Sequence, residues 1–267
     1  MDYADFQHLR FERRADGVLL ITIDRPEVMN AANLVLHREL SDVWTVFDAD
    51  PDMRVAVITG SGRAFSAGGD FSLIEEMTTS YDAVMVQLRD ALAIVQRMVE
   101  TDKPIISAIN GPAVGAGLAV ALLADISIIS ETARIGDGHV RLGVGAGDHA
   151  AIIWPLLCGM AKSKYYLLTA EFLDGREAER IGLVSRCVPE AEVLETALGI
   201  AERLASGAQH ALRWTKRSLN GWLRVNMPIF EHSLALEMLG FMGPDAAEGV
   251  AATRDKRAPR FPSAGGQ

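Results

Sequence analysis

Short continuous apolar runs alternate along the chain with longer stretches in which apolar residues recur every three or four positions. The runs are residues 18–23, 55–59, 105–109 and 126–129, and the helically spaced stretches include residues 33–48 and 81–99. Continuous runs of this length are typical of buried parallel strands, and the wider spacing is typical of amphipathic helices. The pattern predicts an α/β fold built on a wound or stacked parallel sheet.

The two ends of the chain depart from this alternation. Residues 11–14 and 18–23 are β-rich and are joined by Ala15-Asp16-Gly17, which predicts a hairpin. From residue 193 onward the pattern is almost wholly helical, and the composition shifts near Ser206-Gly207. We therefore expect a core domain over residues 1–200 and a helical C-terminal region over residues 201–267.

Residues 104–125 combine a strand, a tight loop and a buried helix. After the apolar run 105–109 come Asn110-Gly111-Pro112, and glycines then lead into the apolar run 118–124. A helix that begins in glycines presents unpaired backbone N–H groups, which favour negative charge. We expect an oxyanion or a phosphate here, close to the loop 63–70, which follows the strand 55–59.

Composition and charge limit which ligands and which cellular location the chain can have. With 267 residues and 49% hydrophobic content the chain can bury a large core, and its net charge of −9 disfavours nucleic acid as a ligand. Cys158 and Cys187 lack the spacing of a zinc site, and the six histidines lack metal-ligand spacing. An acidic N-terminus and an apolar segment interrupted by Asn110 and Pro112 favour a cytoplasmic protein without a membrane span.

Several sequence motifs are absent. The chain has no phosphate loop of the G-x-x-x-x-G-K-[ST] type, no H-E-x-x-H zinc pair and no G-x-S-x-G nucleophile elbow. The segment Gly115-Ala-Gly-Leu-Ala-Val120, with Glu131 further on, begins like a dinucleotide-binding fingerprint, but Val120 stands in place of the third glycine. Nucleotide binding is therefore a distant alternative.

Four motifs together resemble the crotonase, or enoyl-CoA hydratase/isomerase, superfamily. They are Phe65-Ser-Ala-Gly-Gly-Asp70, the spacing Pro104-x-x-x-Ala-x-x-Gly-x-x-x-Gly-x-Gly117, Ala124-Asp125 and Lys256-Arg-x-Pro-x-Phe261. They occur in the family's order over nearly the whole chain. The resemblance implies stacked ββα turns that form a spiral and a C-terminal helical region that forms a homotrimer or a dimer of trimers. It also implies an acyl-CoA thioester as substrate, with coenzyme A as part of the substrate and no separate cofactor or metal.

Two backbone N–H groups are candidates for an oxyanion hole. By position they belong to Gly69 in the loop 66–70 and Ala116 at the start of the buried helix. Small residues suit this role because the backbone must approach the ligand closely. Each glycine considered alone could equally serve a tight turn or helix packing.

The chain departs from the family pattern at the positions of two catalytic glutamates. Ala119 and His139 stand there, so the usual two-glutamate hydration is not expected. His139 and Asp148, followed by Trp154-Pro155 and Tyr166-Leu-Leu-Thr169, are similar to the branch that contains 6-oxocamphor hydrolase, which cleaves cyclic β-diketones. That branch has a further histidine where this chain has Ala116. We interpret His139, supported by Asp148, as the group that transfers protons.

Each of these residues also has a purely structural interpretation. Asp148 could be a helix N-cap, and His139 an ordinary polar loop residue. Asp137 and Arg141 are more typical of solvent contacts or of an internal ion pair. Asp70 is more typical of a carboxylate that braces its loop. We expect Glu231 and His232 on a solvated helix face.

The resemblance also implies where coenzyme A would bind. Arg25 and Met29 occupy positions that contact the adenine and the pantetheine, and Lys256 and Arg257 match a basic position that meets the phosphates. A solvated basic tail is the alternative for that pair. The full set of substrate-binding candidates is Arg25, Met29, Ala64, Ala67, Asp70, Lys256 and Arg257.

The functional hypothesis is an enzyme of the enoyl-CoA hydratase/isomerase family that stabilises a thioester enolate. Double-bond isomerisation or an unusual hydration is chemically more plausible than the two-glutamate reaction. The alternatives are a hydrolase that cleaves C–C bonds in β-diketones without coenzyme A, and a catalytically silent acyl-CoA-binding protein.

Overall fold

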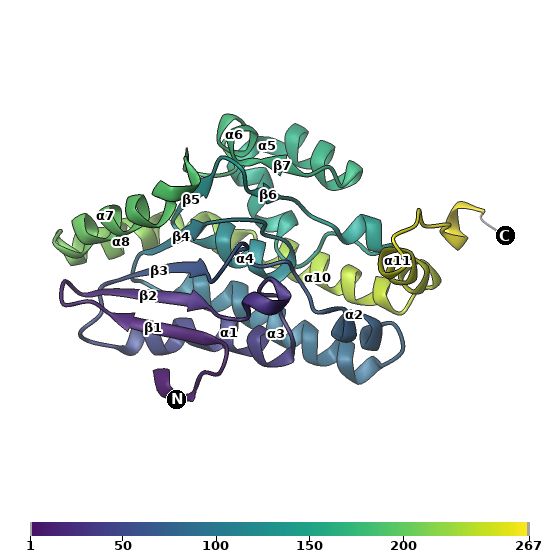
Figure 1. Cartoon of the computed structure of the whole chain (residues 1–267), viewed down its shortest axis with the longest axis horizontal. Coiled ribbons are helices and arrows are strands. Elements are labelled where there is room, and N and C mark those ends of the chain that lie inside the picture. The colour runs from purple at the N-terminus through teal and green to yellow at the C-terminus, as the bar shows by residue number, and fades with distance from the viewer. Residues whose placement is uncertain (1, 266–267) are drawn as a thin grey trace.

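A computed structural model describes residues 2–265, in which a six-stranded sheet carries helices on both faces (Figure 1). The strand order is β1-β2-β3-β4-β5-β8; β1 is antiparallel to β2, and the other neighbours are parallel. This confirms the predicted α/β class and the predicted hairpin. The strands are β1 Leu9–Arg13, β2 Val18–Ile23, β3 Val55–Gly60, β4 Ile105–Ile109, β5 Ile126–Ser130 and β8 Arg186–Val188.

Side-chain N-caps mark the first residues of helices α1 and α3. Asn33 accepts a hydrogen bond from the Leu36 N–H at the start of α1, and Ser80 accepts one from the Ala83 N–H at the start of α3. The helices are α1 Leu34–Ala49, α2 Phe71–Met77, α3 Tyr81–Glu100, α4 Gly115–Leu123, α5 Ala150–Thr169, α6 Gly175–Arg180, α7 Val193–Ala205, α8 Gln209–Leu219, α9 Gly221–Val225, α10 Met227–Phe241 and α11 Pro244–Arg254.

The apolar periodicity indicated neither helix α2 nor residues 150–164, which form the greater part of α5. Both follow glycine-rich loops and carry a weak or mixed apolar pattern, so tertiary packing decides their conformation. A second, two-stranded sheet pairs β6 Arg134–Ile135 with β7 Leu173–Asp174.

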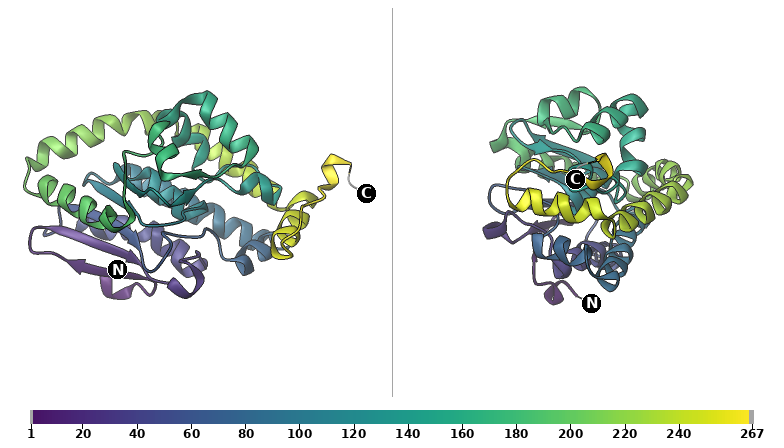
Figure 2. Two further views of the ribbon diagram at one scale, coloured as in Figure 1. Left: turned by 45° about the horizontal axis from the view of Figure 1, so that its top comes forward. Right: turned by 90° about the vertical axis from the view of Figure 1, so that its right-hand side faces the viewer.

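Alternate residues of the central strands pack on opposite faces of the sheet. On one face, side chains such as Ala56 and Ile58 join the core formed with α1, α3 and α4. On the other face, Val55 and Val57 pack against α7, in which the predicted boundary after residue 200 falls. Helices α10 and α11 lie at the end of the molecule remote from α7 (Figures 1 and 2).

The carboxyl ends of β3 and β4 bring two loops together. The loop after β3 meets the loop after β4 through a parallel bridge between Ser66 and Ala113, and it meets the segment after β2 through a bridge between Gly69 and Ala32. In open α/β sheets this edge is the usual place for a ligand. The sheet thus positions the two segments that the sequence marks as an oxyanion site.

The C-terminal helices α8 to α10 expose large apolar side chains. Several of these are more than half exposed, namely Trp214, Leu219, Trp222, Val225, Ile229, Leu236 and Leu239. Such a face is typical of an oligomer interface, and the trimer stays a prediction. Within residues 2–265 no helix has the length and apolar character needed to cross a membrane.

Helix α8 is anchored to the sheet by the buried Lys216. Its Nζ lies 2.8 Å from Asp125 Oδ2 and donates a hydrogen bond of 2.8 Å to the Lys103 carbonyl. We expect Lys216→Met to lower the free energy of unfolding by about 3 kcal/mol, because it leaves the Asp125 carboxylate, whose side chain is 22% exposed, without its cation. Urea unfolding at fixed protein concentration measures this. The exposed Lys164→Met is the control, and an equal effect of the two would contradict the prediction.

Candidate active site

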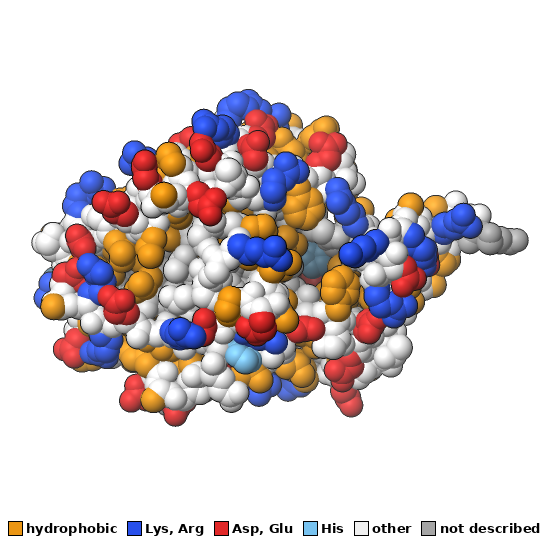
Figure 3. Space-filling view, in the orientation of Figure 1, with side chains coloured by type: hydrophobic (Ala, Val, Ile, Leu, Met, Phe, Trp, Pro, Cys, Tyr) orange, Lys and Arg blue, Asp and Glu red, His pale blue; other side chains and the backbone are white. Residues whose placement is uncertain are grey.

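A cavity of about 320 Å³ opens beside the two glycine loops. Its walls come from α2, α3 and α10, from the loops around Gly69 and Gly115, and from the turn that carries His139. Figure 3 shows a hollow bordered by Lys and Arg side chains with a histidine side chain at its bottom. The cavity therefore combines apolar walls with titratable groups, as is usual for small-molecule sites.

Two backbone N–H groups at this cavity have no partner. In the bridge to Ala32 the hydrogen bonds use the Gly68 carbonyl and the Asp70 N–H, which leaves the Gly69 N–H on the opposite side. Ala116 is in the first turn of α4, where N–H groups lack an intrahelical acceptor. Among residues 2–265 neither N–H donates a hydrogen bond, and both residues line the cavity.

Gly115 stands where the two loops meet. Its φ of +53° favours glycine, whereas a Cβ built there would make only ordinary van der Waals contact with the Gly69 nitrogen, at 3.7 Å. Gly117 has a packing role as well, since a Cβ there would come within 2.3 Å of Ser66 Cβ. The glycines that resemble a dinucleotide fingerprint thus have a steric explanation within this fold.

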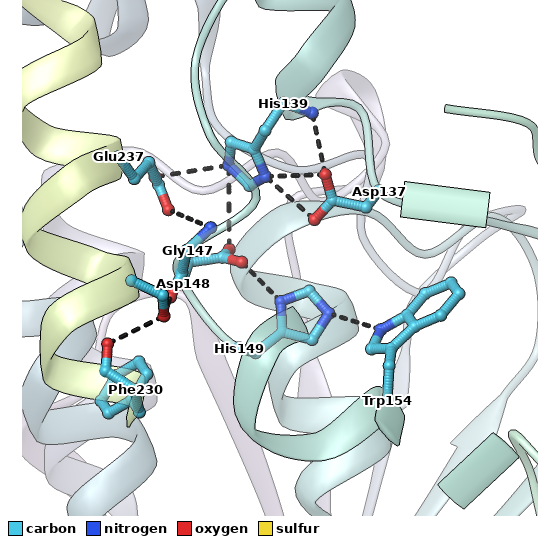
Figure 4. Close-up of polar contacts among 9 residues, drawn as sticks. Asp137, His139, Gly147, Asp148, His149, Trp154, Phe230 and Glu237 are labelled. Carbon is cyan, nitrogen blue, oxygen red and sulfur yellow. Dashed lines mark hydrogen bonds and ion pairs between the residues drawn. The ribbon is translucent and has the colours of Figure 1, made fainter. Parts of the chain in front are cut away.

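His139 is held at the base of the cavity by Asp137. Its backbone N–H donates to Asp137 Oδ1 at 3.0 Å, and its Nδ1 lies 3.1 and 3.0 Å from the two carboxylate oxygens (Figure 4). The other ring nitrogen, Nε2, lies 3.4 Å from Glu237 Oε1 and 4.0 Å from Asp148 Oδ2. Asp137 therefore orients the ring so that Nε2 faces the two other carboxyl groups.

Asp148 is fixed by a second chain of contacts. Trp154 Nε1, which can only donate, donates to His149 Nε2 at 3.4 Å, so the His149 proton is on Nδ1 and is donated to Asp148 Oδ1 at 2.5 Å. This leaves Asp148 Oδ2 turned toward His139 (Figure 4). The N-cap interpretation of Asp148 is wrong, because His149 is the N-cap residue of α5 and its cap has no side-chain hydrogen bond.

Glu237, on α10, is the site residue that the sequence did not reveal. It is 3% exposed, and its Oε2 accepts a hydrogen bond of 3.1 Å from the Gly147 N–H. Gly147 permits this approach, since a Cβ there would lie 2.8 Å from Glu237 Cβ. A signal was present: Glu237 shares its helix face with the apolar residues Phe230, Leu234, Met238 and Phe241.

Burial and charge separate the pKa values of these groups. Burial raises the pKa of Glu237 to about 8, with Asp148 and Asp137 adding to the shift and His139 opposing it. Burial also acts to raise the pKa of Asp148, but His149 and His139 outweigh it and hold that pKa below its ordinary value.

The pKa of His139 is raised as well. Burial acts against the shift, but the carboxylates of Asp137, Glu237 and Asp148 outweigh it. Near neutral pH the cluster therefore contains an ionised Asp148 beside groups that hold protons. Two carboxyl groups with pKa values pushed apart are typical of an acid and a base in one site.

The other residues singled out in the sequence lie partly inside and partly outside the cluster around His139. Asp137 is buried and forms an internal ion pair with His139, whereas the Arg141 guanidinium is 5.3 Å from the centre of the Phe172 ring. Asp70 caps α2 and lies 3.6 Å from Arg25, consistent with bracing its loop. Glu231 and His232 are exposed, as expected.

The predicted coenzyme A contacts lie on both sides of the loop 60–70. Ala67 lines the cavity and its N–H donates to the Met29 carbonyl, whereas Ala64 is fully buried. Met29 is partly exposed and has φ of +53°. On the C-terminal segment Lys256 is exposed, while Arg257 pairs with Glu248 at 2.6 Å.

A cation is not needed to balance the charges of the cluster. The ligand atoms of His139, Asp148 and Glu237 lie within 4.8 Å of one another, which is compatible with a metal ion. However, protons on Glu237 and His139 already reduce the negative charge. The absence of a bound metal stays a prediction.

Comparison with known proteins identifies the family of the chain. The sequence profile of the enoyl-CoA hydratase/isomerase family matches residues 13–264. A probable enoyl-CoA hydratase of Rhizobium meliloti is 38% identical over 91% of this chain and 93% of its own length. The (E)-benzylidenesuccinyl-CoA hydratase of Thauera aromatica is 36% identical over 92% of this chain and 96% of its own length.

The structure agrees as well. A solved enoyl-CoA hydratase/isomerase from Mycobacterium paratuberculosis superimposes with a TM-score of 0.88 at 33% identity, over 92% of this chain and 99% of the other. The chain belongs to the enoyl-CoA hydratase/isomerase family, and its architecture is the crotonase fold that the motifs predict.

Proposed function

We propose that the protein adds water across the double bond of an enoyl-CoA thioester without the usual pair of glutamates. The observation that carries this proposal is that two unpaired N–H groups, of Gly69 and Ala116, share one cavity with His139, Asp148 and Glu237. Donors aimed at a developing oxyanion, placed beside an acid and a base, match the needs of enolate chemistry.

The cluster divides the proton transfers between its members. The thioester oxygen accepts hydrogen bonds from the Gly69 and Ala116 N–H groups. Asp148 Oδ2 and His139 Nε2 are 4.0 Å apart, so a water molecule beside the line that joins them can hydrogen-bond to both; Asp148 accepts its proton as the water oxygen bonds to the β-carbon. The electron pair of the double bond moves onto the thioester, and the enolate then takes a proton at the α-carbon from the His139–Glu237 pair.

This arrangement replaces the family's two glutamates by groups from other positions. Ala119 is buried within α4 and supplies no proton-transfer group, while His139 fills the second position. The two carboxyl groups come instead from the start of α5 and from α10. For the coenzyme A half we propose Arg25, Met29, Ala64, Ala67 and Asp70 around the loop 60–70 and Lys256 and Arg257 on the C-terminal segment, in a cytoplasmic homotrimer or dimer of trimers.

The test is mass spectrometry of a panel of enoyl-CoA thioesters incubated with the purified protein. Hydration adds the mass of one water molecule, whereas isomerisation leaves the mass unchanged and moves the double bond. Thioesters that are bound but returned unaltered would indicate a silent acyl-CoA-binding protein. Cleavage of a β-diketone without coenzyme A would indicate a C–C hydrolase. Isomerisation, return of the thioester unaltered or cleavage of a β-diketone would each contradict the proposal.

The pH dependence of the reaction tests the role of Glu237. Since burial raises the pKa of Glu237 to about 8, it holds a proton below that pH and loses it above. If Glu237 acts as an acid, kcat/KM falls as pH rises through about 8. We expect Glu237→Gln to lower kcat/KM about thirtyfold at neutral pH and to remove that alkaline limb. The control is Glu231→Gln on the same helix, which should keep both the rate and the limb.

A further inference from the structure

His37 and Gln87 are two polar side chains in the cavity wall that no step above uses. His37 comes from α1 and Gln87 from α3, and both line the cavity. They are 7% and 5% exposed. Neither lies on the loops that hold Gly69 and Ala116, so they contact a different part of any bound molecule.

Each of these side chains has a shielded polar atom without a partner. His37 Nδ1 and Gln87 Oε1 have no hydrogen bond to any residue in the part of the chain that the structure describes. Among residues 2–265, seven buried side-chain atoms share this condition, and of these only the atoms of His37 and Gln87 belong to cavity-lining residues. A buried polar atom without a partner costs free energy of folding, so two of them on side chains that line one cavity point to a ligand group that pairs with these side chains.

The chemistry of the two atoms limits what that group can be. An amide oxygen only accepts hydrogen bonds, so its partner must donate one, which an alkyl chain or a thioester cannot do. Burial lowers the pKa of His37 to about 4, so the ring is neutral near pH 7 and offers one donor and one acceptor. Neither of these two side chains therefore offers a positive charge to a carboxylate, whereas a hydroxyl group both donates and accepts hydrogen bonds.

We propose that His37 and Gln87 select an acyl-CoA whose acyl group bears a hydroxyl group, held by hydrogen bonds to these two side chains. The inference rests on the function proposed above for the identity of the thioester. It deepens that function by adding a substrate class. The apolar wall contributed by Leu73, Met77 and Ala91 contacts the carbon chain that leads to this hydroxyl.

Binding of saturated acyl-CoA thioesters tests the proposal without any turnover. Isothermal titration compares a series of ω-hydroxyacyl-CoA thioesters of increasing chain length with their deoxy counterparts. At the matching length we expect the hydroxylated ligand to bind about tenfold tighter than its counterpart, because a site built to hydrogen-bond a hydroxyl discriminates against its absence. A ratio near one at every length overturns the proposal; a bound water molecule alone at these atoms would give that result.

Substitutions test whether His37 and Gln87 cause the preference for the hydroxylated ligand. Gln87→Met and His37→Leu should each bring the affinity ratio close to one, while leaving the deoxy ligand bound about as well as before. Both variants should be at least as heat-stable as the wild type, since they remove unpaired polar atoms. The exposed Gln7→Leu and His232→Leu are matched controls that keep the ratio. A preference that survives both cavity substitutions overturns the proposal.

The two proposals can fail separately. An enzyme that hydrates enoyl-CoA thioesters but binds hydroxylated and deoxy ligands equally keeps the proposed function and loses this inference. A protein that prefers the hydroxylated ligand but returns every enoyl-CoA unaltered keeps the inference and loses the proposed hydration.

Discussion

His139→Ala is expected to lower kcat/KM for enoyl-CoA about a thousandfold. The substitution removes the group that lies between Asp148 and Glu237 and that returns a proton to the α-carbon, and acid–base groups of this kind contribute about a hundredfold to ten-thousandfold. Steady-state kinetics on the same enoyl-CoA measures the effect. Since the Gly69 and Ala116 N–H groups stay in place, residual activity above the uncatalysed rate should persist.

Controls must show that the loss of activity in His139→Ala does not come from a misfolded protein. His232→Ala, at an exposed position on α10, should retain full activity. The affinity of the His139→Ala protein for a saturated acyl-CoA should stay within about threefold of the wild type, because His139 acts on the transition state and not on the ground state. A variant that keeps more than about a tenth of the wild-type kcat/KM would show that His139 does not carry the proton.

Asp148→Asn is expected to lower kcat/KM about a hundredfold. Asparagine keeps the shape and can still accept the hydrogen bond from His149, but it cannot take the proton of the attacking water. The exposed Asp82→Asn, on α3, is the control.

The double variant shows whether the two groups act together. If His139 and Asp148 serve one proton-transfer unit, the combined variant should be little worse than His139→Ala alone, because the effects of such residues do not add. Multiplication of the two single effects would instead indicate independent roles and would contradict the shared water position.

The sequence predicted the elements that depend on local periodicity. The apolar runs became β2 to β5, and the helically spaced stretches became α1 and α3, with Asn33 capping the first of these. The resemblance to the crotonase superfamily implied that Gly69 and Ala116 lie at one site, and in the structure both residues line the same cavity.

Contacts between residues far apart in the chain could not be predicted from the sequence. Glu237 reaches the site only because α10 packs on α3 and α5, ninety residues after Gly147, to which it bonds. The burial of Asp137 and the unpaired atoms of His37 and Gln87 also depend on tertiary packing. The sequence did contain one indication of this contact, because Glu237 is an acidic residue on an apolar helix face. Such residues are rarely buried without a partner or a function.

The most direct test of the proposed function is the transfer of a solvent deuteron to the α-carbon of an enoyl-CoA thioester. The protein is incubated with the thioester in D2O, and the position of the label is read by mass spectrometry and NMR. The proposed mechanism predicts a hydrated product with deuterium at the α-carbon for the wild type, and almost no label for His139→Ala. A thioester returned unlabelled by the wild type, or labelled equally by both proteins, would contradict it.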